Sequence, residues 1–269
     1  MYIRAGYEIS YELSQPTPML LMLSIHPTRV PDLVTPHQMK IEPPIAIHEY
    51  RDGFGNLCSR IVAPAGQMTI STDFVVEDSG EPDVVAADAQ QKAVHELPDE
   101  VLVFLLGSRY CETDQLSDAV WSLFGKGPRG WALVQAICDY IHGHIKFGHK
   151  HVRPTKTALD TFVEGEGVCR DFAHLAITFC RCMNIPARYC TGYLGNIGVP
   201  AADEPIDFNA WFEVYLGDRW YVFDARHNTR RIGRILMARG RDATDVALIT
   251  SFGPSTLTRF NIITYALDG

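Results

Sequence analysis

The chain has 269 residues, a formal net charge of -8 and a hydrophobic content of 46%. These values are ordinary for a folded globular protein and argue against a disordered chain. The acidic balance leaves no basic stripe of the kind that follows a phosphate backbone, so the sequence argues against nucleic acid as a partner. No stretch approaches the roughly 20 apolar residues of a membrane helix, and the first residues lack the apolar core of a signal peptide. We therefore expect a cytoplasmic protein that has no membrane partner.

The cysteines indicate reduced thiols rather than a disulfide framework. There are seven of them, an odd number, and their spacing is not that of a metal site. Cys180 and Cys182 lie two residues apart on a predicted helix, where side chains point to different sides, so we favour buried thiols over a metal pair. Nothing in the sequence indicates a metal or an organic cofactor.

The first 80 or so residues have the pattern of an antiparallel sheet. Apolar side chains alternate with polar ones over residues 7–14, and the alternation returns over residues 68–76. Asp52-Gly53 followed by Gly55-Asn56 is typical of a hairpin. The sequence predicts an antiparallel β-sandwich domain over residues 1–85.

The pattern then changes to helices. Residues 78–90 are poor in large apolar side chains and are predicted to form a linker. Apolar residues at helical spacing predict a helix over residues 116–124, capped by Thr113-Asp114, and a second helix over 130–143. Strands return from about residue 187, and an alternating segment at 257–264 is expected to close a sheet. The predicted class is α+β, with a second domain over residues 86–269 in which helices pack on an antiparallel sheet.

Cys169 stands at the predicted start of an amphipathic helix. Gly165 and Gly167 bracket a turn, and helical spacing of apolar residues follows as far as Met183. Asn184 suits the left-handed position after a helix. A helix N-terminus favours a thiolate and can hold an oxyanion. Most cysteines are small buried hydrophobes, and the glycine turn is what separates Cys169 from the other six.

Two predicted strands, 209–216 and 219–225, are joined by Gly217-Asp218, a strong hairpin signal. In the register that this turn sets, Trp211 faces Asp224. Asn209 and Asp224 then become diagonal neighbours, roughly 7 Å apart at Cβ. A histidine at position 209 would meet Asp224 on one side and could meet Cys169 on the other, which is the geometry of a catalytic triad.

These segments resemble the bacterial transglutaminase-like superfamily, a papain-like fold of cysteine acyltransferases and proteases. The resemblance rests on Gly167-Val-Cys-Arg-Asp-Phe-Ala-His174, Ile185-Pro-Ala-Arg188 with Gly192-Tyr193, and the strands around Trp211 and Trp220. It covers about residues 130–230, and more loosely the N-terminal sheet. The resemblance implies that Cys169 is the nucleophile, that Asp224 is the orienting acid, and that the base belongs at position 209, where this chain has Asn209.

An amide does not titrate near neutral pH, so Asn209 cannot act as a general base, although it can hydrogen-bond Asp224. Loss of general acid–base assistance costs on the order of 10²–10⁴ in rate. Three explanations stay open: a deliberate substitution, a non-catalytic relative, or another histidine acting as the base. His227 is the first alternative, but strict strand alternation places it opposite Asp224 unless the strand ends first. His174 lies about 140° round the helix from Cys169, so we expect it to pack or to bind backbone.

Two further segments suggest contributions to the site. The histidine-rich segment 142–151 lacks cysteine or acidic neighbours that would complete a zinc site, so we favour a polar loop that lines the substrate cleft. Residues Asp203 to Asp207 contain three acids and are expected to form a loop at the rim of the cleft, where they could affect specificity.

Two functional hypotheses follow. In the first, the protein is a transglutaminase-like cysteine acyltransferase or amidase/protease that acts on peptide or glutamine amides through a Cys169 thioester, impaired by Asn209. In the second, it is a pseudoenzyme that binds peptides without turnover. Both imply a peptide or protein partner, and the sequence does not indicate an oligomeric state.

Overall fold

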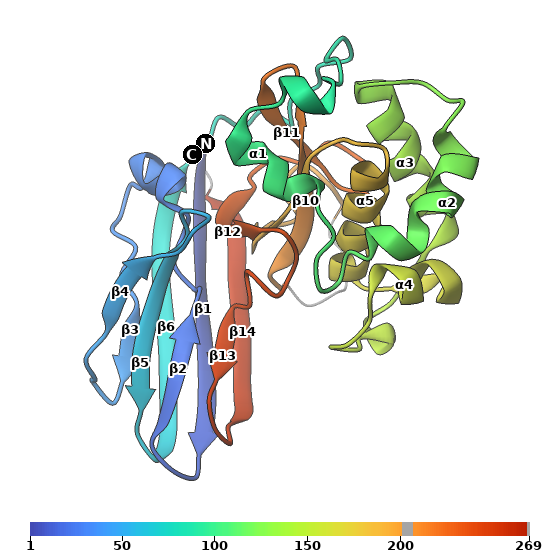
Figure 1. The fold of residues 1–269 in the computed structure, drawn as a ribbon. Coiled ribbons are helices and arrows are strands. Elements are labelled where there is room, and N and C mark those ends of the chain that lie inside the picture. Colours follow the sequence, from blue (N-terminus) through green and yellow to red (C-terminus); the bar gives the residue numbers. More distant parts are fainter. Residues whose placement is uncertain (201–206, 268–269) are drawn as a thin grey trace.

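The computed structural model describes residues 1–200 and 207–267. Figure 1 shows a β-rich half beside a half in which helices pack against a sheet. The observed fold is therefore α+β, as the sequence predicted.

The β-rich half is a sandwich of two four-stranded antiparallel sheets. The first sheet has the order β14-β1-β6-β3, and the second has the order β13-β2-β5-β4. Apolar side chains of both sheets form one core, in which Ile9 and Phe74 are almost completely buried. The strands of the two sheets are β1 Tyr2–Leu13, β6 Gly66–Glu77, β3 Lys40–Glu42 and β14 Thr256–Leu267, and β13 Ile249–Ser251, β2 Thr17–Leu21, β5 Leu57–Ala63 and β4 His48–Arg51.

The C-terminal strands belong to this sandwich. Strand β14 pairs with β1 from Tyr2↔Leu267 to Glu12↔Thr256, and β13 pairs with β2. The alternating segment at 257–264 thus closes a sheet, as predicted, but the sheet that it closes is the N-terminal one. The boundary expected near residue 85 separates two patterns along the chain. The sandwich nevertheless includes strands β13 and β14, within residues 249–267, because they pair with β2 and β1.

The second half places α5 against a sheet with the order β11-β10-β9-β12. Helix α5 is buried along nearly its whole length, between this sheet and helices α2, α3 and α4. The helices are α1 Asp99–Leu102, α2 Thr113–Phe124, α3 Trp131–His144, α4 Ala158–Glu164 and α5 Cys169–Cys182. The strands are β9 Ala187–Tyr193, β10 Asn209–Leu216, β11 Arg219–Phe223 and β12 Ile235–Gly240, with a short parallel pair, β7 Lys146–Phe147 and β8 Glu166–Gly167.

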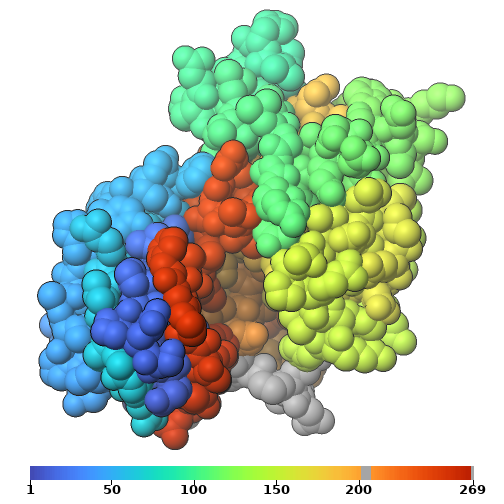
Figure 2. Space-filling model, turned by 60° about the horizontal axis from the view of Figure 1, so that its bottom comes forward, coloured from blue at the N-terminus to red at the C-terminus, as the bar shows by residue number. Residues whose placement is uncertain are grey.

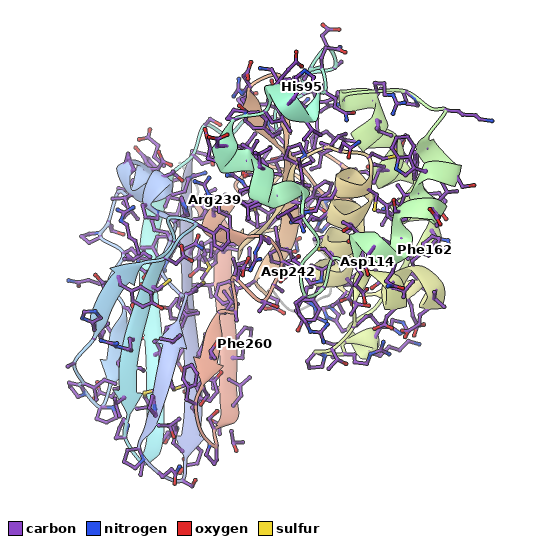
Figure 3. The ribbon with its side chains drawn as sticks, viewed as in Figure 1. His95, Asp114, Phe162, Arg239, Asp242 and Phe260 are labelled. Atoms are coloured by element: carbon purple, nitrogen blue, oxygen red, sulfur yellow. The ribbon has the colours of Figure 1, made fainter. Side chains whose placement is uncertain are left out.

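The cap predicted for α2 is wrong. The helix begins at Thr113 and its N-cap residue is Glu112, whose side chain does not bond the helix. The Glu112 carboxylate instead accepts the backbone N–H of Leu159 at 3.0 Å, which ties the start of α2 to α4. Figure 3 labels Asp114 in the first turn, where its charge favours the positive end of the helix.

The two halves meet at β12. Asn56, from the predicted hairpin at 52–56, is completely buried. Its amide nitrogen donates to the carbonyl oxygen of Arg239 at 2.8 Å, and its amide oxygen accepts the N–H of Arg239 at 2.9 Å. Beyond β12, Asp242 accepts the N–H of Tyr110 at 2.8 Å and thereby reaches the helical side. Figure 3 labels Arg239 and Asp242 in this junction.

The hairpin that precedes the site has the predicted register. Leu216 pairs with Arg219 and Phe212 with Phe223. Gly217 and Asp218 have φ values of 52° and 68°, the two left-handed positions of a tight hairpin turn. The ladder ends at Phe223, so Asp224 is the first residue after β11 and the predicted pairing of Trp211 with Asp224 does not form.

Candidate active site

Helix α5 begins at Cys169, as the glycine turn predicted. Val168 is the extended N-cap residue, and its N–H donates to the carboxylate of Asp171 at 3.0 Å, which closes the first turn. Gly167 lies so close to this turn that a Cβ atom there would be 2.8 Å from the Cβ of Asp171. The start of α5, and with it the position of the sulfur, therefore depends on a residue without a side chain at 167.

Cys169 is more exposed than the other six cysteines, all of which are buried. Burial raises the pKa of its thiol, and the positive charge of Arg226 and a hydrogen bond from the backbone of Ala210 offset only part of this increase. The resting sulfur is thus a thiol at neutral pH. Its use as a nucleophile requires a group that takes its proton.

Cys169 opens into a cavity of about 750 Å³. Figure 2 shows the surface hollowed between the red C-terminal strands and the yellow-green residues near position 150. The wall is mixed, with apolar side chains next to charged and titratable ones. Its lining residues are Phe147, His149, Val152, Val168, Cys169, Leu194, Asn196, Val199, Pro200, Asp207, Phe208, Asn209, Arg226, His227, Thr229 and Arg231.

Asn209 lines the same cavity, but its side chain is not directed to Asp224. Its amide nitrogen donates to the carbonyl oxygen of Asp207 at 3.1 Å and, more weakly, to that of Leu194 at 3.4 Å. Its amide oxygen accepts from Nη1 of Arg226 at 3.3 Å. The expected hydrogen bond to Asp224 is absent among the described residues, because other donors occupy both oxygens of that carboxylate.

Four donors hold the carboxylate of Asp224. Oδ1 accepts the backbone N–H groups of Arg226 and His227, each at 3.0 Å. Oδ2 accepts from Nδ1 of His227 at 2.8 Å and from Nη2 of Arg234 at 3.1 Å. Burial alone would raise the pKa of Asp224, but the hydrogen bonds from His227 and the charge of Arg234 hold it well below its usual range. Asp224 is thus a buried, ionised carboxylate.

His227 lies beside Asp224, contrary to the prediction from strict alternation. Strand β11 ends at Phe223, and the next backbone N–H groups turn inward to bind Oδ1 of Asp224. Asn228 follows in a left-handed conformation, with φ of 48°. The period-2 rule does not apply to a turn, so His227 comes back to the side of the carboxylate. The sequence signal that could have predicted this turn is the order Asp-x-x-His-Asn directly after a strand.

Arg226 is a site residue that the sequence did not single out. Its guanidinium lies 3.6 Å from the centre of the Phe147 ring, a cation–π contact at the cavity wall. The hydrogen bond to Asn209 ties it to the first residue of β10. Arg226 thereby places a positive charge near the sulfur of Cys169.

The other candidate histidines serve the fold. His142 and His144 bind the carbonyl oxygens of Arg226 and Phe162, and His151 pairs with Glu166. His149 does line the cavity, in agreement with the expectation of a cleft-lining loop. His174 is buried and its Nε2 accepts the N–H of Ala243, so it binds backbone, as expected.

No group of three metal-ligating side chains occurs within residues 1–200 and 207–267. The same residues contain no helix that is long and apolar enough to cross a bilayer. Of the predicted rim loop, Asp203 and Glu204 lie outside the described residues, whereas Asp207 lines the cavity.

Comparisons with known proteins agree with this architecture. The model of the transglutaminase-like superfamily matches residues 124–225, a span that contains Cys169, Asn209 and Asp224 and ends two residues before His227. A crystal structure of a "putative cysteine protease" from Cytophaga hutchinsonii is 30% identical, with a TM-score of 0.86 over 100% of this chain and 91% of that chain. The chain belongs to the transglutaminase-like superfamily.

Similar chains also occur in mycobacteria. An uncharacterized protein of Mycobacterium leprae is 28% identical over 209 residues, which are 74% of each chain. An uncharacterized protein of Mycobacterium tuberculosis is 28% identical over 234 residues, 78% of this chain and 73% of that one.

Proposed function

We propose that the protein is a cysteine enzyme that cleaves or transfers the acyl group of peptide or glutamine amides through a thioester at Cys169. The observation that supports it best is one cavity lined both by Cys169, at the N-terminus of α5, and by a histidine bound to the buried carboxylate of Asp224. A thiol, an imidazole and an ionised carboxylate are the three groups that covalent acyl transfer uses.

In the proposed reaction, the sulfur of Cys169 attacks the carbonyl carbon of the amide. A tetrahedral oxyanion forms, and the N–H groups at the start of α5 can stabilise it. The C–N bond then breaks, the amine leaves with a proton, and the acyl group remains on sulfur as a thioester. Attack by water gives hydrolysis, and attack by a second amine gives acyl transfer.

The cavity supports a peptide as the substrate. Its apolar residues, among them Val152, Leu194 and Phe208, can take side chains, while Asp207, Arg226 and Arg231 offer polar contacts. The name of the Cytophaga hutchinsonii relative, a "putative cysteine protease", agrees with peptide-bond cleavage.

Peptide binding without turnover is a second candidate function. Two points favour it: burial raises the pKa of the Cys169 thiol, and an amide, Asn209, stands where the family resemblance places the base. Under this alternative, the protein would bind a peptide in the cavity with Cys169 intact.

Turnover by two probes separates the candidates. Carbobenzoxy-Gln-Gly reports release of ammonia from a glutamine side chain, and fluorescently labelled casein reports cleavage of peptide bonds. We expect turnover of at least one probe that is lost in Cys169→Ala and kept in Cys182→Ala, a control at the other end of the same helix. Binding of casein peptides without turnover would favour the second candidate, and turnover that survives Cys169→Ala would contradict the first.

A further inference from the structure

A histidine is bound to Asp224, but it is not at position 209, where the family resemblance places the base. His227 follows Asp224 by three residues and reaches the carboxylate through the turn after β11. Asn209 binds Arg226, Asp207 and Leu194 instead. In one cavity, the imidazole of His227 therefore binds the carboxylate of Asp224, whereas the amide of Asn209 binds Arg226.

The hydrogen bond to Asp224 fixes the proton on the ring of His227. Because Asp224 is ionised, it accepts, and Nδ1 therefore carries the hydrogen of this bond, which leaves Nε2 without a hydrogen when the ring holds a single proton. The second nitrogen, Nε2, is then a lone-pair acceptor. Within the described residues it has no hydrogen-bond partner, and it is not among the buried unpaired atoms. In the singly protonated ring, Nε2 is therefore an unpaired acceptor on a residue that lines the same cavity as Cys169.

The buried carboxylate is itself braced. Arg234, whose side chain is 7% exposed, donates to the same oxygen of Asp224 that His227 binds. Backbone N–H groups occupy the other oxygen. This bracing leaves Asp224 no freedom to turn toward position 209, so the carboxylate is built to orient a histidine at 227.

Resting on the proposed function, we propose that His227 is the general base and acid of the reaction and that Asn209 is a positioning residue for Arg226. Nε2 of His227 takes the proton from Sγ of Cys169 as the S–C bond forms. The resulting imidazolium, stabilised by Asp224, returns that proton to the nitrogen of the amide as the C–N bond breaks. This acylation step balances in protons and electron pairs, and water or a second amine then takes the acyl group from the sulfur.

Arg226 completes the arrangement. Its guanidinium lies over Phe147 and binds the amide oxygen of Asn209, which keeps its charge on the sulfur side of the cavity. Arg226 therefore favours the thiolate that the proton transfer produces.

Sγ of Cys169 and Nε2 of His227 do not form a hydrogen bond in this structure. Contacts of this kind often shorten only when substrate is bound.

The test compares three histidine variants of the full chain with the probes that the unaltered protein turns over. His227→Gln should lower kcat by about 10²–10⁴. His144→Gln, in a side chain that stacks on Tyr140 outside the cavity, should leave kcat within a fewfold of the original. His149→Gln tests the other imidazole on the cavity wall. A loss at His149 that exceeds the loss at His227 would overturn the proposal.

A structural role for His227 would give the same loss, so a second readout is needed. We expect added imidazole to restore part of the turnover of His227→Gly, and the acid limb of the kcat/KM profile against pH to disappear in that variant. Failure of imidazole to restore turnover, with the acid limb retained, would overturn the assignment. If the unaltered protein shows no turnover that depends on Cys169, the proposed function itself fails and the role of His227 falls with it.

Discussion

Arg234 joins the predicted linker to the acid of the candidate site. Its Nη2 donates to Asp224 at 3.1 Å, while its Nε donates to both oxygens of Asp83 at 3.0 and 3.1 Å. Asp83 lies in the segment 78–90, which the sequence describes only as a polar connection. The segment between the two halves is therefore part of the support of Asp224.

Removing this arginine should destabilise the protein strongly. Arg234→Met leaves two carboxylates of low exposure, Asp224 and Asp83, without their shared cation. Loss of one partner of a buried ion pair costs about 3–5 kcal/mol of unfolding free energy. Urea unfolding measures the loss. Arg4→Met is the matched control, because the Arg4–Asp73 pair is largely exposed and should contribute roughly 0–1 kcal/mol. Equal losses in the two variants would contradict the support role of Arg234.

Arg226 should control the reactivity of the thiol. Its charge lowers the pKa of Cys169 against the opposing effect of burial. Arg226→Met should therefore raise that pKa further, and a shift of about one unit would slow alkylation at pH 7 roughly tenfold. The rate of iodoacetamide alkylation as a function of pH gives the midpoint. Arg226→Lys keeps the charge and should shift the midpoint less, whereas an unchanged midpoint in Arg226→Met would show that the guanidinium does not act on the sulfur.

A histidine at position 209 should not rescue catalysis. Asn209→His removes the hydrogen bonds to Arg226 and Asp207, and the imidazole would find Asp224 already occupied by His227 and Arg234. We expect turnover of the amide probes to fall, by at most about tenfold, because the base at 227 remains. A gain of a hundredfold or more in kcat would instead identify position 209 as the proper place of the base.

Acid should unfold the protein partly through a buried histidine, His26, that does not line the cavity. Burial, together with the charges of Arg239 and Arg188, lowers the pKa of His26 to about 4. The folded state then binds fewer protons than the unfolded state below about pH 6.5, the ordinary histidine value. The free energy of unfolding is therefore highest above that pH and falls toward pH 4, by about 1.4 kcal/mol per pH unit.

Urea midpoints measured between pH 7.5 and 4.5 check this slope. His26→Gln should flatten it, and His95→Gln, a substitution of the exposed residue labelled in Figure 3, should not. His26 accepts the N–H of Thr28 at 3.2 Å, so some loss of stability at pH 7.5 is expected in the first variant, and only the change with pH is diagnostic. A slope that is the same in all three proteins would exclude His26 as the acid-sensitive group.

The sequence predicts the local geometry well where a rule of periodicity applies. Apolar spacing and the glycine turn place the start of α5 at Cys169, and Gly217-Asp218 fixes the register from Leu216 to Phe212. These features depend on residues that are neighbours in sequence. The roles assigned to Cys169, Asn209 and Asp224, and the cytoplasmic location, stay predictions.

Features that depend on distant or irregular segments escaped prediction. The alternation rule does not apply after Phe223, where the strand ends. The chain turns there so that two backbone N–H groups bind one oxygen of Asp224, and this turn brings His227 to the side of the carboxylate. The pairing of β14 with β1 depends on contacts across almost the whole chain, which no local pattern encodes. Arg234 and Asp83 are ordinary surface-type residues in the sequence, and only the fold brings them together.

The pairing of β1 with β14 has a consequence for how the protein is made. Tyr2 is synthesised well before its partner Leu267, and helices α1 to α5 all lie between the two residues in the chain. Until then, one edge of the long strand β1 has no partner, and such edges attract other chains. Completion of the sandwich is therefore a late event with a large loop to close, which slows folding.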